Sequence, residues 1–429
     1  MAGRGLGGSY RRLWTASAVS TLGDGMYLAA LPLLAATLTR DPLAVSVVTF
    51  AGWLPWLLFA LPAGALVDRL DRRRVMWTVD AARAVVVGAL TAAVLAGWAS
   101  IPLLAAAGFL VGAGQTLFEN AAQAMVVAVV GRDPRRLERA NGQLVASLTV
   151  GQQLAGPPLG SAAFAMATWV PFLADAVSFG ASASLVAAIK GRFGAEDAPA
   201  PRGPAPHLPA EPPARRSLWA EIGEGLRFLV GHRLLRAAVL LVSASNLAFM
   251  AGEAVLVLFA TEELGLGSRG YGLLLAAVAV GGLPGSLLAA RVGGRVPPGR
   301  LIVGGVLAGA VVMAGFGLAT NPWLAAAAYA ATGAVWGVWN VTLLSLRQAI
   351  VPDRLMGRVV GAIRLVGFGS IPIGALLGGV VARTLGLRAP FLLGAAVLAV
   401  AALAAAPVVT TPAIEAARSE AGAGPWRPG

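Results

Sequence analysis

The sequence contains no cysteine, only two histidines and a single lysine among its 429 residues. Without cysteine, the chain can form no disulfide, no thiol nucleophile and no thiolate metal site. His207 and His232 both fall in the central part of the chain, so a histidine-rich metal centre is excluded as well. The only lysine, Lys190, belongs to no G-x-x-x-x-G-K-[ST] pattern, which excludes a phosphate-binding loop for ATP. We expect no metal and no cofactor.

Charged residues are also scarce. They make up 12% of the chain, whereas hydrophobic residues make up 57%. Soluble domains carry about 25% charged residues, because a folded soluble chain must cover its exterior with polar groups. A helix needs about 20 apolar residues to cross a bilayer, so twelve crossings use roughly 240 residues. The composition therefore predicts an all-α polytopic membrane protein with twelve transmembrane helices.

Apolar segments recur along the chain, separated by turn residues or charges. The first follows Arg4, Arg11 and Arg12, as in a secretory signal peptide, but it is too long for one and contains Asp24. We therefore expect it to remain as the first membrane helix. The twelve predicted helices span residues 13–38, 44–67, 77–97, 101–129, 142–168, 170–190, 236–261, 271–290, 300–319, 323–346, 359–383 and 389–410.

The basic residues cluster in alternate loops between these helices. Cytoplasmic loops of membrane proteins carry an excess of Lys and Arg, which predicts a multi-pass protein of the cell inner (cytoplasmic) membrane with both termini in the cytoplasm. Only Arg40, Arg269, Arg383 and Arg388 then face outside. The net charge of +13 is spread over loops and not gathered on one soluble face. We therefore expect the lipid bilayer as a partner, and no nucleic acid.

The longest predicted loop divides the chain into two sets of six helices. Its Pro- and Ala-rich stretch, 195–216, is typical of disorder, and Glu221 to Leu235 is typical of a short amphipathic helix on the membrane surface. We predict four parts: an N-terminal six-helix half (1–190), a partly disordered cytoplasmic linker (191–235), a C-terminal six-helix half (236–411) and a disordered cytoplasmic tail (412–429).

The two sets of helices also share a glycine pattern. Three glycines of the fifth predicted helix recur in the eleventh at a constant offset of 218 residues, and both triplets follow an Arg-rich loop. Two parallel six-helix repeats characterise one large class of transporters. The pattern therefore favours a pseudo-symmetric chain that is complete as a monomer. The paired glycines are Gly151, Gly156 and Gly160 with Gly369, Gly374 and Gly378.

The loop between the second and third predicted helices reads G-A-L-V-D-R-L-D-R-R-R from Gly64 to Arg74. It resembles the G-x-L-x-D-R-x-G-R-R signature of the major facilitator superfamily. Asp71 replaces the usual Gly, so we expect a left-handed turn at an Asp. The resemblance implies the twelve-helix major facilitator fold and a conformational latch, in which Asp68 meets the positive start of the eleventh helix. The latch residues are Gly64, Asp68, Arg69, Arg72, Arg73 and Arg358; the alternative is an ordinary basic loop.

The fifth predicted helix contains Gly156-Pro157-Pro158-Leu159-Gly160. Gly156, Pro157 and Gly160 resemble the G-P-x-x-G motif of proton-coupled exporters in the superfamily; the alternative is a kinked packing helix. The stretches Gly23-Asp24 and 171–179, together with 225–229 and 352–358, resemble the enterobactin-exporter and macrolide-efflux branch of drug:proton antiporters.

Acidic residues inside membrane helices are costly and are therefore functional candidates. Because the first, fourth, seventh and tenth helices line the central cavity in the superfamily, the resemblance favours Asp24, Glu119 and Glu253 for proton coupling. The alternative is structural neutralisation, for instance by Arg83 or Arg364, and we expect Asp80 and Arg83 to form a structural pair. The polar and aromatic candidates for lining a substrate cavity are Gln115, Asn120, Asn246, Trp336, Trp339 and Asn340.

These features together predict a secondary active transporter and not an enzyme. The branch resemblance favours proton-coupled export of amphipathic small molecules, such as drugs or a siderophore, by alternating access. Uptake and a non-transporting membrane sensor stay open as alternatives. A membrane transferase is disfavoured, because Asp68 and Asp71 have no second acidic motif to complete a metal site and are crowded by arginines.

Overall fold

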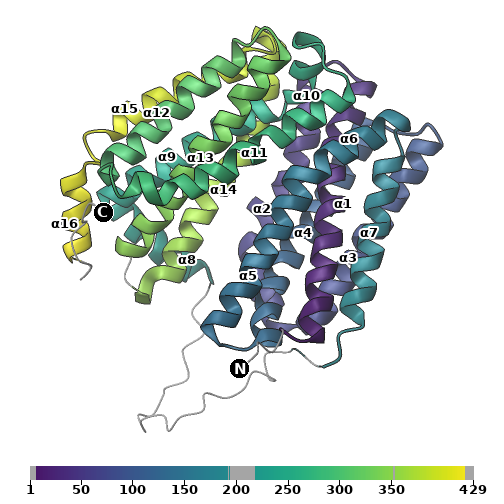
Figure 1. The fold of residues 1–429 in the computed structure, drawn as a ribbon, viewed down its shortest axis with the longest axis horizontal. Coiled ribbons are helices and arrows are strands. Elements are labelled where there is room, and N and C mark those ends of the chain that lie inside the picture. The colour runs from purple at the N-terminus through teal and green to yellow at the C-terminus, as the bar shows by residue number, and fades with distance from the viewer. Residues whose placement is uncertain (1–5, 192, 194–217, 351–352, 421–429) are drawn as a thin grey trace.

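The computed structural model describes residues 6–191, 193, 218–350 and 353–420, and these residues form helices with no strand among them (Figure 1). The elements that precede residue 191 are α1 (Gly8–Leu38), α2 (Pro42–Arg69), α3 (Arg72–Leu95), α4 (Ile101–Val130), α5 (Pro134–Leu148), a π-helical turn (Thr149–Ala155), α6 (Gly156–Met166) and α7 (Val170–Ala187).

The later elements begin with α8 (Leu218–Gly231) and α9 (Arg233–Glu253). They continue with α10 (Leu256–Leu258), a π-helical turn (Phe259–Glu263), α11 (Ser268–Gly293), α12 (Pro298–Gly317), α13 (Pro322–Ile350), α14 (Asp353–Leu385), α15 (Ala389–Ala405) and α16 (Thr411–Glu420).

The length and apolarity of these helices fit a membrane. Nine helices in the described part of the chain are long and apolar enough to cross one, and Ala389–Ala405 is a shorter apolar helix. Helix starts follow local chemistry: the carboxylates of Asp41, Asp71 and Asp133 accept backbone N–H groups at the first turns of α2, α3 and α5. The full count of twelve crossings stays a prediction.

Two predicted helices are interrupted. The fifth, predicted at 142–168, is divided by the π-helical turn Thr149–Ala155, which leads directly into Gly156-Pro157-Pro158. Because proline has no N–H to continue the i→i−4 ladder, the hydrogen bonding changes register there. The seventh, predicted at 236–261, ends its regular part at Glu253, and a second π-helical turn follows at Phe259–Glu263.

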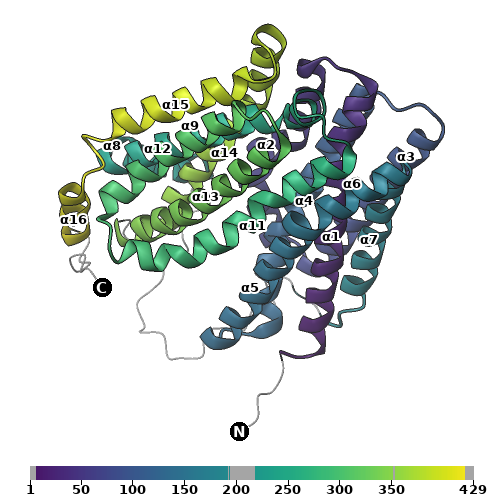
Figure 2. The same cartoon turned by 45° about the horizontal axis from the view of Figure 1, so that its top comes forward.

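The helices α1–α7 pack mainly on one another and form a first group; α9–α15 form a second group. Figures 1 and 2 show the two groups side by side, joined where α2 meets α14 and where α6 meets α11. We call the side with the start of α1 and the end of α7 the linker side, and the opposite side the far side. In Figure 1 the groups come together toward the far side and diverge toward the linker side.

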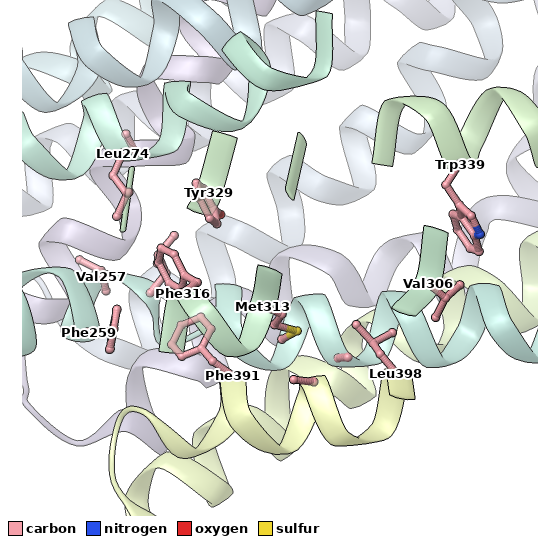
Figure 3. Packing of buried hydrophobic residues seen from close by; sticks show 14 of the residues in the cluster. Val257, Phe259, Leu274, Val306, Met313, Phe316, Tyr329, Trp339, Phe391 and Leu398 are labelled. Atoms are coloured by element: carbon pink, nitrogen blue, oxygen red, sulfur yellow. The ribbon is translucent and has the colours of Figure 1, made fainter. Parts of the chain in front are cut away.

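Buried apolar side chains fill the second group. Figure 3 shows Phe259, Phe316 and Phe391 close together, and the Phe316 ring centroid lies 5.3 Å from that of Phe259 and 5.0 Å from that of Phe391. This cluster continues along α12, α13 and α15 through Met313 and Leu398. Close ring packing of this kind fixes the spacing of the helices that carry the rings.

The tail after residue 411 differs from the prediction of disorder. Thr411–Glu420 forms α16, which packs against α12 and α13, and Ile414 is 1% exposed. The sequence prediction missed this helix because its ten residues carry charges and only a short apolar stripe. The predicted surface helix in the linker corresponds to α8, whereas the expected disorder at 195–216 and 421–429 lies outside the described residues.

Candidate functional site

A buried ionic cluster joins α1, α3 and α7 in the first group. Arg83 Nη2 lies 2.6 Å from Asp24 Oδ1, and Arg83 Nη1 lies 3.3 Å from Asp80 Oδ1. The hydroxyl of Ser182 donates to Asp80 Oδ2 over 2.6 Å. Because the Arg83 side chain is only 2% exposed, these are interior ion pairs and not surface contacts. The expected pair of Asp80 and Arg83 is therefore present, and Asp24 belongs to the same network.

A third carboxylate belongs to this cluster. Asp175, on α7, is 0% exposed, and its Oδ1 accepts the Ser178 hydroxyl over 3.3 Å. Its Oδ2 is buried without a hydrogen-bond partner among the described residues, as is the hydroxyl of Tyr27. The charges of Asp24, Asp80 and Arg83 all act on Asp175. The cluster therefore holds three carboxyl groups and one guanidinium.

Apolar and small residues close the cluster off from its surroundings. The Arg83 guanidinium carbon lies 3.8 Å from the centroid of the Phe179 ring. Gly114 on α4 leaves room for the arginine stem, because a Cβ there would come within 2.8 Å of Arg83 Cγ and Cδ. Gly23 does the same for Asp175 and Ser178. In these surroundings each interaction between charges is stronger than in water, and an unbalanced charge is costly.

Only part of this cluster is predictable as functional from the sequence. The sequence favours Asp24 for proton coupling and predicts a structural pair of Asp80 and Arg83, but it does not place Asp175 among the proton-coupling candidates. The signals were nevertheless present: Gly23-Asp24 and residues 171–179 are both stretches of the branch resemblance, and the structure brings them together. Their contact across helices is not visible in a single sequence.

The candidate residues on α4 form hydrogen bonds within their own helix. Gln115 Nε2 donates to Glu119 Oε1 over 2.7 Å, one helical turn away. Asn120 Nδ2 donates over 2.7 Å to the carbonyl of Thr116 on its own helix. Gln115 Oε1 is buried without a hydrogen-bond partner among the described residues. Glu119 and Gln115 thus form a polar pair, and Asn120 satisfies its helix backbone.

Glu253 lies in the second group, at the point where α9 ends. One of its carboxylate oxygens accepts a hydrogen bond from the hydroxyl of Tyr329 on α13. The carboxylate faces a cavity of about 30 Å³ between α9, α12, α13 and α15. Aromatic rings form much of its wall, and Phe249 and Trp336 have centroids 5.6 Å apart. Tyr329 carries no signal in the sequence that would have linked it to Glu253.

A second cavity of about 20 Å³ continues from the first. The two share Ser245, Gly309, Trp336 and Leu398 as lining residues, and the second reaches Trp339. Figure 3 shows Trp339 near Val306 and Leu398, at the opposite end of the row from Tyr329 and Phe316. Trp336 and Trp339 line these small cavities within the second group; that they line a substrate cavity stays a prediction.

The remaining cavity candidates occupy other positions. Asn246 donates from Nδ2 to the carbonyl of Gly367 over 2.8 Å and so links α9 to α14. Asn340 on α13 is exposed at the molecular surface. Asn246 has the contact expected of a residue that bonds helix to helix.

The glycine–proline motif of α6 lies against α1. Gly156 packs on the backbone of Gly25, and Gly160 packs on the backbone of Met26, where no larger side chain would fit. Their offset-related partners make the same kind of contact in the second group: Gly374 packs on the backbone of Leu247 of α9. Gly378 likewise packs on Ala251. The motif therefore allows a close helix contact; whether it also marks an exporter stays a prediction.

The signature loop between α2 and α3 is anchored to the end of α7. Asp71 caps α3 with an extended backbone (φ −67°, ψ 113°), so the expected left-handed turn is wrong: the residue accepts backbone N–H groups, which needs no positive φ. Its Oδ2 also accepts the N–H of Phe193 over 3.2 Å. Arg73 donates over 2.6 Å to the carbonyl of Ile189.

The predicted latch itself falls largely outside the described residues. Gly64 and the backbones of Asp68 and Arg69 belong to α2, but the side chains of Asp68, Arg69 and Arg358 are not described. Arg72 follows the capping Asp71 at the start of α3. The latch therefore stays a prediction.

Ion pairs join the two groups at the far side. Arg40 Nη1 lies 3.3 Å from Glu262 Oε1, and Arg383 Nε lies 3.6 Å from Asp41 Oδ1. Nearer the middle of the same helices, the Trp56 ring centroid lies 5.8 Å from that of Phe368. The Arg383–Asp41 and Trp56–Phe368 contacts connect α2 with α14 from their middle to the far side.

Solved structures of transporters have the same fold. A point mutant of the nucleoside transporter NupG superposes with a TM-score of 0.71 at 11% identity, covering 92% of this chain and 98% of the other. A bacterial homologue of the iron transporter ferroportin superposes with a TM-score of 0.70 at 15% identity, covering 92% and 97%. The chain therefore shares the fold of these transporters.

The chain belongs to the transmembrane secretion effector family of the major facilitator superfamily, whose family model matches residues 7–427. It is 28% identical over 390 residues to the multidrug efflux pump Tap of Mycobacterium tuberculosis (strain ATCC 25618 / H37Rv), covering 88% of each chain. It is 26% identical over 404 residues to the uncharacterized transporter YfiS of Bacillus subtilis (strain 168), covering 90% and 89%. The expected superfamily is confirmed, and so is the expectation of a transporter and not an enzyme.

Proposed function

We propose that this transporter is a proton-coupled exporter of amphipathic small molecules that works by alternating access. The buried cluster of Asp24, Asp80, Asp175 and Arg83 is the observation that carries the proposal. It contains two more acidic than basic groups, in an interior where unbalanced charge is costly. Protons that bind to these carboxylates reduce the excess of negative charge, and loss of such a proton changes the attraction between α1, α3 and α7.

Metal coupling is less well supported by the same side chains. Among the described residues, no group of three His, Cys, Asp or Glu side chains is arranged to hold a metal ion. Arg83 occupies the place at Asp24 and Asp80 that a cation would need. Protons can instead bind to single carboxyl oxygens, such as the unpartnered Oδ2 of Asp175.

Alternating access is supported by where the groups meet. The ion pairs of Arg40 with Glu262 and of Arg383 with Asp41 lie at the far side, so the molecule is closed there. The matching glycine contacts of α6 on α1 and of α14 on α9 support two pseudo-symmetric halves of six helices that rock as units. We assign the linker side and both termini to the cytoplasm from the distribution of arginines in the sequence.

Export of drug-like compounds is supported by the similarity to Tap, a multidrug efflux pump, over most of the chain. Uptake remains the alternative direction, but this similarity does not favour it. The membrane-facing helices and the aromatic residues of α13 suit amphipathic compounds, since such residues bind both apolar and cationic surfaces.

Transport in reconstituted vesicles tests the proposal. Purified protein in liposomes is given an imposed pH gradient, and internal pyranine reports proton movement while macrolides, ethidium or siderophores are added. We expect compound-dependent proton movement that is lost in Asp24→Asn and in Asp175→Asn but kept in Glu138→Gln, an exposed acid outside the cluster. Correctly folded protein that moves no proton with any compound would refute proton coupling for that panel, and transport only toward the cytoplasm would favour uptake.

A further inference from the structure

The second group of helices contains its own buried acid, which the ionic cluster does not include. Glu253 is on α9, whereas the cluster lies between α1, α3 and α7, and no residue belongs to both. Tyr329 of α13 donates to Glu253, and the carboxylate faces the 30 Å³ cavity. Tyr271 of α11 is the other titratable group on which the Glu253 charge acts.

No cation balances this carboxylate among the described residues. The described arginines that form ion pairs do so with Asp24, Asp41, Asp80, Glu262 and Glu263. The cavity walls beside Glu253 are mainly apolar: Phe316 and Met313 come from α12, and Phe391 comes from α15. A lone carboxylate in such a wall is costly, so the site requires either a cation or a proton.

The cavity beside Glu253 suits a proton accompanied by water. A water molecule needs roughly 10–15 Å³ of such space, so the cavity of about 30 Å³ has room for roughly two waters beside the carboxylate. Ser245 and Thr332 line it together with Glu253 and Tyr329, which provides the polar partners that bound water requires. The second cavity, of about 20 Å³, extends the row toward Trp339, whose indole N–H is buried without a described partner.

The end of α9 places this site close to a contact between the two groups. The helix ends at Glu253, Val255 leaves helical geometry (φ −115°, ψ 4°), and a π-helical turn follows at Phe259–Glu263. The same turn carries Glu262, which pairs with Arg40 of the first group. A change of charge at Glu253 therefore occurs close to an irregular segment that contacts the first group, and π-helical turns are frequent at functional sites.

We infer that Glu253 and Tyr329, with water in the adjoining cavity, form a second proton-binding site, independent of the Asp24–Asp80–Asp175–Arg83 cluster. When the proton binds, it forms an O–H bond on one carboxylate oxygen; Tyr329 keeps its own proton and continues to donate to the other. The inference rests on the proposed proton coupling. It adds that each half carries a separate proton, so that one transport cycle moves one proton more than the cluster alone provides.

Infrared spectroscopy tests the second site without any transport substrate. Protein in lipid vesicles is titrated with acid while the carbonyl stretch of protonated carboxyl groups is recorded. We expect two separable signals: Glu253→Gln removes one and leaves the other unchanged, whereas Asp175→Asn does the reverse. Tyr329→Phe shifts the frequency of the Glu253 signal alone, because it removes the hydrogen bond to that carboxyl group. Glu138→Gln changes neither signal.

Three outcomes would overturn the inference. Glu253 that stays ionised across the whole titration would show that the carboxylate is balanced by another cation. A spectrum unchanged in Glu253→Gln would show that Glu253 takes up no proton in this range. A Glu253→Gln variant that also displaces the cluster signal would show one coupled site. If both signals are found but the vesicle assay detects no compound-dependent proton movement, the second site stands and the proposed function fails.

Discussion

Arg83 Nη2 lies 2.6 Å from Asp24 Oδ1, and this contact joins α3 to α1 in the interior of the first group. Asp80, on the same helix as Arg83, pairs with the same guanidinium. Asp175 lies close enough for its charge to interact with those of Asp24 and Arg83. One arginine thus balances part of the charge of three acids from three helices. Its removal should affect the protein more than the loss of any one acid.

Arg83→Gln is expected to destabilise the fold by about 3–5 kcal/mol, because it leaves buried carboxylates without their cation. Thermal unfolding of the purified protein in detergent measures the loss, with exposed Arg136→Gln as the control, which should change stability by less than about 0.5 kcal/mol. Adding Asp80→Asn to Arg83→Gln should recover part of the stability. If the double variant is less stable than the single one, the charge-balance argument is wrong.

The glycines of α6 and α14 should respond alike to enlargement. Gly160→Val and Gly378→Val each force a side chain into the backbone of a neighbouring helix, at Met26 and Ala251, and overpacking of this kind costs about 1–3 kcal/mol or more. Gly142→Val is the control, since nothing lies within 4 Å of the position where its Cβ would be. Size-exclusion chromatography and thermal unfolding report the effect; tolerance at either buried position would argue against close packing there.

The far-side closure can be tested by cross-linking, because the natural chain has no cysteine to interfere. Cysteines at the positions of Arg40 and Glu262, whose side chains now lie 3.3 Å apart, should react together with a short bifunctional maleimide. The linked protein should lose transport, because the two groups can no longer separate at that side. A monofunctional maleimide on the same variant should leave most transport intact; full transport after confirmed cross-linking would contradict alternating access.

The anchor between the signature loop and the end of α7 can be separated from simple helix capping. Asp71→Ala removes both the cap of α3 and the acceptor for Phe193, whereas Asp133→Ala removes only the cap of α5. A lost cap costs about 0.5–2 kcal/mol, and the lost bond to Phe193 should add about 1 kcal/mol at position 71. Equal losses of stability in the two variants would show that the contact with Phe193 contributes nothing.

The predicted latch can be tested at Asp68. Asp68→Asn should lower transport while leaving expression unchanged, because an amide cannot pair with the positive start of α14 as a carboxylate does. Transport in vesicles, normalised to the amount of inserted protein, measures the effect. Transport equal to that of the wild type would remove the latch from the mechanism.

Several features were predictable because they depend on local composition. Membrane helices are recognised from runs of apolar residues, the pair of Asp80 and Arg83 from its spacing of three, and the close-packed positions Gly156 and Gly160 from their glycines. Two predictions from local sequence rules, for Asp71 and for the C-terminal tail, were wrong. Asp71 caps a helix and does not make a left-handed turn, and the tail folds as α16 because Ile414 finds an apolar contact that only the folded helices provide.

The sequence alone determined that this protein is helical, lies in a membrane and has no thiol, metal-thiolate or ATP-loop chemistry, because composition and apolar run length set these properties without reference to neighbours. Only the tertiary structure decided which buried acids belong together. Asp24 and Asp175 are about 150 residues apart in the chain, and Glu253 and Tyr329 belong to different helices. A helix position fixes which face a side chain occupies, but packing between helices decides what that face meets.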